Sequence, residues 1–189
     1  MDKITLISSV LAFSMVLLML FTYTPSLSGM AIDSAAINLT VNTSTSISLE
    51  ISTVDFGTLM TNSTDDTSDN SPQPFVVRND GNVNVDVSIK ANQSMFSGTG
   101  AGNDTDTFQF KTANCSLSVC GFIELNSFDW ANSTISWTNF TDVEQGVIDS
   151  LEYANTSDEA EVDIRVFVPL DEPAGSKGAT ITFTATQES

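Results

Sequence analysis

The stretch FVVRNDGNVNVDVSIK, residues 75–90, decides the fold class of this chain. In its second half every other residue is aliphatic and the residues between are polar; the aliphatic positions are Val83, Val85, Val87 and Ile89. Successive side chains of a strand point to opposite faces, so this alternation predicts a strand with one buried face. The preceding Asn79-Asp-Gly-Asn82 is a turn signal, because these residue types tolerate the backbone of tight turns. The stretch therefore predicts a strand entered through a turn.

The same period of two recurs along the chain. It is found at Ile47–Ile51, Phe108–Phe110, Ile135–Trp137, Val162–Val168 and Ile181–Ala185. Further turn signals lie in residues 98–104 and 172–175. Many short alternating strands separated by turns predict an all-β fold, an antiparallel β-sandwich of immunoglobulin-like or jelly-roll type.

Two segments depart from this pattern. Between Asp142 and Ala154 the apolar residues fall at helical intervals, which predicts a short helix or turn. Residues 61–71 are too polar to be buried and predict a solvated acidic loop. Asp65, Thr67 and Asp69 alternate there as calcium ligands do, but the glycine and distal glutamate of an EF-hand are missing.

The first residues predict export. Met1-Asp-Lys3 carries one positive charge, and residues 4–23 are almost uninterruptedly apolar. Small residues follow, and Gly29-Met-Ala31 suits signal-peptidase cleavage. Residues 1–31 are therefore interpreted as a signal peptide, with an uncleaved N-terminal membrane anchor as the alternative. The remainder divides into an N-terminal arm, residues 32–44, and a β-sandwich domain, residues 45–189.

Nine N-glycosylation sequons are the second strong feature, well above the number that the Ser and Thr content would place by chance. Their asparagines are Asn38, Asn42, Asn62, Asn92, Asn103, Asn114, Asn132, Asn139 and Asn155. N-linked glycans are attached outside the cytosol to exposed chain. The sequons therefore predict an extracellular or cell-surface glycoprotein, with Asn62, Asn103 and Asn155 the most accessible sites and Asn114 the most constrained.

Charge excludes two classes of partner. The chain has 24 acidic and 6 basic residues and a formal net charge of −18. Nucleic acid requires a basic footprint, and anionic membranes attract basic segments. We therefore expect no nucleic-acid partner, and no membrane contact once the leader has been removed.

The two cysteines predict a local disulfide. Cys115 and Cys120 are too far apart for a redox CxxC motif, and the chain contains no histidine for a zinc site. In an exported protein the pair is expected to be oxidised. Without histidine or a free thiol, the usual nucleophile–base constellations cannot form. We expect no catalytic residue, metal or cofactor, and no enzymatic activity.

Three further motifs carry a family resemblance. Val54-Asp-Phe-Gly57 precedes the stretch already quoted, and the chain closes with IRVFVP, residues 164–169, and ATITFTA, residues 179–185. This order, over about residues 45–187, resembles the secreted β-sandwich subunits of archaeal threads and bundling pili and is similar to the TasA/camelysin-type biofilm fibre proteins.

The resemblance implies assembly by donor-strand complementation, in which the N-terminal strand of one subunit fills a groove in the next. Residues 32–41 offer a candidate donor, because Ile37, Leu39 and Val41 share one face of an extended strand. An ordinary first strand within its own domain, or a flexible stalk, is the alternative. Asn38 and Asn42 lie in or beside this strand, so a glycan on Asn38 requires its face to stay exposed.

These features and the resemblance together predict a non-enzymatic, glycosylated subunit of an extracellular filament, a pilus or thread. The resemblance implies that the filament supports adhesion or biofilm. Its partners would be copies of itself, joined head to tail, and N-linked glycans. The alternative is a membrane-tethered or S-layer-associated binding module that does not polymerise.

Overall fold

The computed structural model describes residues 39–98, 107–121, 123–154 and 156–188. The chain divides into two compact units, residues 1–40 and 41–189. The proposed leader, Ile37 and Asn38 lie outside the described residues, as do Asn103 and Asn155. Within the described part of the chain, no helix is long and apolar enough to cross a membrane.

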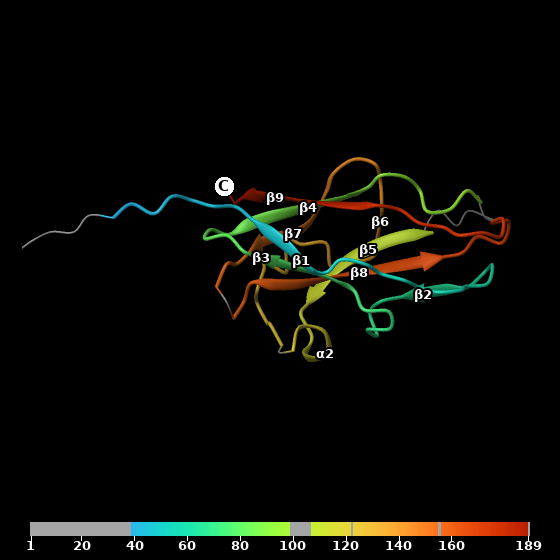
Figure 1. Cartoon of the computed structure of the whole chain (residues 1–189), viewed down its shortest axis with the longest axis horizontal. Coiled ribbons are helices and arrows are strands. Elements are labelled where there is room, and N and C mark those ends of the chain that lie inside the picture. The colour runs from blue at the N-terminus through green and yellow to red at the C-terminus, as the bar shows by residue number, and fades with distance from the viewer. Residues whose placement is uncertain (1–38, 99–106, 122, 155, 189) are drawn as a thin grey trace, which may run out of the picture. The chain divides into compact units, whose positions relative to one another are not determined.

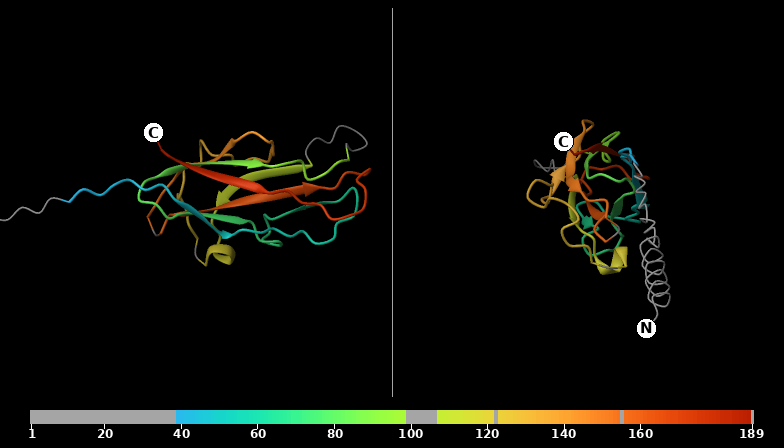
Figure 2. Two further views of the ribbon diagram at one scale, coloured as in Figure 1. Left: turned by 45° about the horizontal axis from the view of Figure 1, so that its top comes forward. Right: turned by 90° about the vertical axis from the view of Figure 1, so that its left-hand side faces the viewer.

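The second unit is an all-β sandwich (Figures 1 and 2), as the sequence predicts. Its elements are β1 (Ile47–Ile51), β2 (Thr64–Asp66), β3 (Phe75–Asn79), β4 (Val85–Ala91), β5 (Phe108–Asn114), α2 (Leu117–Cys120), β6 (Thr138–Asn139), β7 (Gln145–Leu151), β8 (Glu159–Phe167) and β9 (Ile181–Gln187). One sheet has the order β1-β3-β8-β5-β6, with β2 also pairing β8, and the other has the order β7-β4-β9. Every pairing is antiparallel. Assignment to the immunoglobulin-like or jelly-roll type stays a prediction.

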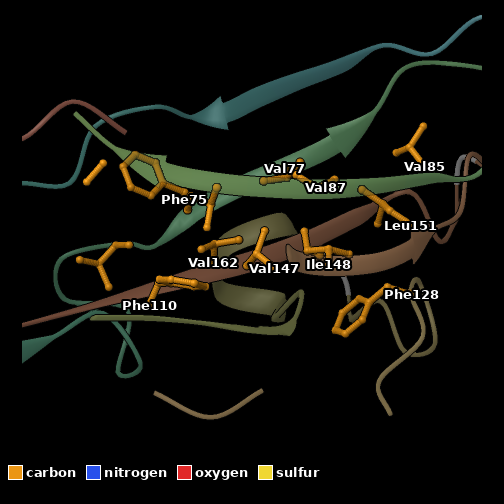
Figure 3. Close-up of a cluster of buried hydrophobic side chains, with 14 of the residues drawn as sticks. Phe75, Val77, Val85, Val87, Phe110, Phe128, Val147, Ile148, Leu151 and Val162 are labelled. Carbon is orange, nitrogen blue, oxygen red and sulfur yellow. The ribbon is translucent and has the colours of Figure 1, made fainter. Parts of the chain in front are cut away.

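The inward faces of the two sheets form one apolar core (Figure 3). β4 alternates between buried and half-buried residues along its whole length, which confirms the pattern read from residues 85–90. Val83, the first aliphatic position of the predicted strand, precedes β4 and is half-buried. Val85, Val87 and Ile89 are its buried aliphatic residues, and they belong to the same core cluster as Val162 and Ile164 of β8. Period-two alternation on facing strands is therefore what joins the two sheets.

The prediction of a short helix or turn over residues 142–154 is wrong, because this segment contains the strand β7. The β4–β7 pairing has two register shifts, and Val147 and Ile148 are both buried although they are neighbours in sequence. Such irregularities break the strict period of two that identifies a strand. The spacing of Val147 and Leu151 consequently resembles one turn of helix.

Two smaller expectations also fail. Residues 135–137 form no strand, and only Thr138–Asn139 pair with β5. The acidic loop is not wholly solvated, because residues 64–66 form β2 and Thr67 is fully buried. Thr67 is accommodated because its hydroxyl donates to Asp163 Oδ1 at 2.9 Å and accepts the N–H of Ile164 at 3.0 Å. A buried polar side chain with both partners supplied costs little.

The core predicts a large effect of truncation at Phe110, which is fully buried and lies 4.8 Å from Phe140 between ring centroids. Phe110→Ala is expected to lower the free energy of unfolding by about 3–5 kcal/mol, because it removes buried area and leaves a cavity. Leu170→Ala is the matched control, since Leu170 is 58% exposed, and its effect should stay within about 0.5 kcal/mol. Chemical denaturation measures both, and equal losses in the two variants would contradict the core assignment.

Candidate assembly site

The sandwich is open between strands β1 and β9. β1 is the edge of one sheet and β9 is the edge of the other. Each has one strand partner among the described residues, β3 for β1 and β4 for β9. The outer edge of each strand therefore presents main-chain N–H and C=O groups that a further strand could pair with.

An apolar groove lies between these edges. It has a volume of about 300 Å³. Its apolar lining comprises Leu49, Val54, Phe56, Phe75, Met95, Phe108, Ile164, Ala179, Ile181 and Phe183. Central-strand residues of this lining are buried, whereas Leu49, Ile181 and Phe183 on the edge strands stay half-buried. The half-buried side chains would lose more water contact if another apolar strand filled the groove.

Strand register places the groove at one end of the sandwich. β1 begins at Ile47, opposite Asn79, and ends at Ile51, opposite Val76. β9 begins at Ile181, opposite Ala91, and ends opposite Val85. The groove is lined by the end of β1 and the beginning of β9, so it lies away from the turn between β3 and β4.

The chain enters β1 at the opposite end. Residues 42–46, which we call the arm root, lie beside the β3–β4 turn and lead into Ile47 (Figure 1). The arm root and the groove thus occupy opposite ends of the second unit. Leu39 and Val41 are 83% and 71% exposed and belong to no strand.

The sequon asparagines of the described residues differ in accessibility. Asn42, Asn62, Asn92 and Asn132 are exposed, and Asn114 and Asn139 are half-buried on β5 and β6. Asn92 adjoins the groove, since its Oδ1 accepts the N–H of Thr180 at 2.8 Å. Their glycosylation stays a prediction.

The two cysteines lie together at the two ends of a segment that contains a short helical turn. Their sulfur atoms are at bonding distance and their Cα atoms are 5.9 Å apart, which agrees with the predicted pairing. α2 follows Cys115 and includes Cys120 as its last residue, and its C-cap is Gly121 with a φ of 81°. Only glycine adopts this left-handed backbone at little cost, so Gly121 allows the chain to leave the helix end.

A row of buried carboxyl groups lies on the outer face of β8. Alternation predicts that Asp163 faces solvent, but Glu159, Glu161 and Asp163 are all buried. Glu161 Oε1 accepts the N–H of Ser116 at 2.6 Å. Asp163 accepts the Thr67 hydroxyl and lies 3.6 Å from Lys111 Nζ. The cysteine loop and the residues after β2 therefore supply hydrogen-bond partners to this face.

Burial raises the pKa values of these carboxyl groups. Desolvation of the charged form is the largest cause for Glu159, Glu161 and Asp163. It is also the largest cause for Glu124, whose Oε2 accepts the N–H of Glu159 at 2.7 Å. Sequence reasoning missed this row, because nothing in the chain marks which loops return to cover the outer face of β8.

The basic side chains are engaged within the domain. Arg78 lies 2.6 Å from Glu50 and 2.9 Å from Asp80, and Lys90 lies 3.2 Å from Glu144. The remaining contacts are Lys111 with Asp163, Lys177 with Glu172, and Arg165 with Gln109 and Trp137. The large acidic excess is therefore left uncompensated.

One group of three metal-ligand side chains is close-set among the described residues. Cys115, Cys120 and Glu161 have ligand atoms within 4.8 Å of one another. The two sulfurs are bonded to each other, and a disulfide sulfur is not the thiolate that binds metal. This group does not fit a metal ion in the oxidised protein.

Comparisons with protein-family models, curated protein sequences and solved structures return no match to this chain. The resemblance to thread and pilus subunits stays a prediction.

The raised pKa of Glu161 predicts a pH-dependent stability. The cost of burying its charge is absent below the ordinary glutamate pKa and is complete above the raised folded-state pKa, so the free energy of unfolding falls as pH rises through this window. We expect a higher melting temperature at about pH 5 than at about pH 7.

Glu161→Gln should reduce this difference, because the amide oxygen can still accept the Ser116 N–H without carrying charge. The exposed Asp142→Asn is the control and should leave the difference unchanged. Each kcal/mol corresponds to about 2–4 °C in a domain of this size. Thermal melts across this pH range measure the effect, and an undiminished difference in Glu161→Gln would refute the assignment.

Accessibility also predicts a gradient of glycan occupancy. Asn42, Asn62, Asn92 and Asn132 should be occupied more fully than Asn114 and Asn139, because the latter pair are half-buried on strands. Glycopeptide mass spectrometry of the protein from its native source measures occupancy at each site. A mass equal to that of the bare polypeptide would reject glycosylation altogether.

Proposed function

We propose that this protein is a structural, non-enzymatic subunit of an extracellular glycosylated filament assembled by donor-strand complementation. Residues 32–41 of the arm of one subunit enter the groove between β1 and β9 of the next. The filament supports adhesion or biofilm. The single observation that carries the proposal is an apolar groove in a chain that also has an alternating apolar arm. The groove lies between two strand edges that have no further strand partner in the described part of the chain.

The groove and the arm have matching chemistry. The lining offers partly exposed Leu49, Ile181 and Phe183. The arm brings Ile37, Leu39 and Val41 at alternate positions, so its apolar side chains would face one way in an extended conformation. Burial of three aliphatic side chains contributes roughly 5–9 kcal/mol before the cost of ordering the arm. Main-chain hydrogen bonds to an open edge add direction and register.

The positions of the arm root and the groove suit linear growth. They lie at opposite ends of the second unit, so a subunit can donate at one end while it accepts at the other. A head-to-tail contact of this kind joins unlike surfaces and does not close on itself unless a rotation brings the ends together. The expected product is a polar filament.

The remaining features agree with a cell-surface role. The acidic excess keeps subunits soluble before assembly and repels anionic partners. Exposed sequon asparagines, such as Asn62 and Asn132, are not among the residues that line the groove. Asn92 adjoins the groove, so its glycan would have to extend outward from the mouth.

The test of assembly removes or spoils the arm. The exported protein lacking residues 32–41 should remain a soluble monomer, because no strand is left to fill a neighbour's groove. Leu39→Asp should severely weaken polymerisation, since a charge would have to be buried among apolar side chains. Electron microscopy and sedimentation measure filament formation.

The matched control for Leu39→Asp is Leu170→Asp, which adds the same charge at another exposed leucine outside the arm. This control should polymerise normally. Normal filaments from the deletion variant would rule out assembly through this segment. A persistent monomer from the intact exported protein would instead favour a membrane-tethered or S-layer-associated module that does not polymerise.

A further inference from the structure

We infer that Asn82 is a positioning residue that holds the arm root in line with β1 and thereby directs the arm into a neighbouring subunit rather than into its own groove. This inference rests on the proposed function and adds the means by which self-insertion is disfavoured. It is carried by the contacts between the arm root and the β3–β4 turn.

The β3–β4 turn is held in place by the side chain of Asn79. Asn79 is 1% exposed and its side chain makes three hydrogen bonds. Its Oδ1 accepts the N–H of Gly81 at 2.9 Å, and its Nδ2 donates to the carbonyls of Val83 at 2.9 Å and Leu151 at 3.0 Å. The turn is thus tied both to itself and to β7, and a buried amide with these partners is costly to displace.

Asn82 connects the β3–β4 turn to the arm root by hydrogen bonds. Its Oδ1 accepts the N–H of Ser44 at 2.7 Å, and its own N–H donates to the Ser44 carbonyl at 3.0 Å. Its Nδ2 donates to the Asn42 carbonyl at 2.9 Å. The N–H of Asp80 adds a bond to the Ser46 carbonyl at 2.9 Å. These bonds extend the line of β1 beyond its first residue.

The neighbouring glycine allows the close approach. A Cβ on Gly81 would lie 2.3 Å from the Ser44 carbonyl oxygen, far inside van der Waals contact. The arm root therefore rests directly on the main chain of the turn. A side chain at this position would push the arm root away and break the Asn82 contacts.

This arrangement bears on a competing reaction. The arm precedes β1 in sequence, so a reversal at residues 42–46 would lay the arm along the open edge of its own β1 as a hairpin. The arm and that groove belong to one chain, and covalent connection gives an intramolecular partner a high effective concentration. Reversal requires the main chain of residues 42–46 to curl, which is incompatible with the straight path fixed by Asn82.

The straight path also sets the direction of the added strand. An arm that continues the line of its own β1 into the next subunit runs parallel to the acceptor's β1 and antiparallel to its β9. A hairpin in its own groove would have the reverse relation, antiparallel to β1 and parallel to β9. The two modes therefore differ in which chains are joined and in strand direction.

The test measures insertion of the arm into a neighbouring subunit against insertion into its own groove. The full-length chain carrying Leu39→Cys and Ile181→Cys is exported, and a short bismaleimide then crosslinks the two introduced thiols. Crosslinks between chains give a ladder on a denaturing gel, and crosslinks within a chain give a monomer of defined mass. Adding Asn82→Ala should lower the ratio of interchain to intrachain product about tenfold, a change equivalent to about 1.4 kcal/mol.

Two further variants keep the result interpretable. Asn84→Ala is the matched control in the same turn, since the Asn84 side chain contacts Ser150 and not the arm root, and it should keep the parent ratio. Asn82→Asp retains the acceptor for the Ser44 N–H and loses the donor to Asn42, so its ratio should be intermediate. It also serves if Asn82→Ala fails to fold.

The outcomes separate the two ideas. A parent ratio in both Asn82 variants overturns the positioning role and leaves filament assembly standing. A fall in Asn84→Ala equal to that in Asn82→Ala also overturns it, because the effect would then belong to the turn as a whole. No crosslink between positions 39 and 181, within or between chains, overturns donor-strand assembly itself and the positioning role with it.

Discussion

Burial of alternating aliphatic side chains between β4 and β8 is the interaction on which the rest of the structure depends. Val85, Val87 and Ile89 on one strand, and Val162 and Ile164 on the other, belong to a single buried cluster. β4 lies between β7 and β9, and β8 pairs with β2 and β3 on one side and β5 on the other, so both are central strands. Their burial satisfies main-chain hydrogen bonding and the hydrophobic effect together, which is what a sandwich requires.

The same constraint explains why one side of the sandwich is open to a further strand. The central strands complete the core, but among the described residues no strand lies between β1 and β9 to finish the burial of their inward side chains. An incomplete edge with apolar side chains invites another strand and, left open, invites aggregation. A donor arm would bury these side chains and pair the open edge. An arm root fixed by Asn82 would direct that arm into a neighbouring molecule.

Charge acts on the outer face in a different way. The outer face of β8 is acidic, and loops return over Glu159, Glu161 and Asp163 so that these side chains are buried with hydrogen-bond partners. The pKa of each group rises because burial disfavours the charged form. Protonation of these buried carboxyl groups by acid therefore favours folding. Glu172 acts in the opposite direction, because its pKa is lowered chiefly by its hydrogen bond with Lys177. Its protonation, at lower pH, therefore disfavours folding.

The sequence by itself determined the local elements: the strands β4, β8 and β9, the turn at residues 79–82, and the cysteine pairing that the sulfur positions support. These follow from period-two alternation, turn chemistry and short separation, all of which act within a few residues. Only the tertiary structure decided that residues 145–151 form β7, because bulges break the period, and that Asp163 is buried, because distant loops cover it. The groove and the contact of Asn82 with the arm root were also beyond local pattern. Each depends on which strands lie side by side. Pairing between strands that are distant in sequence produces no periodic pattern in the sequence, so local pattern cannot predict it.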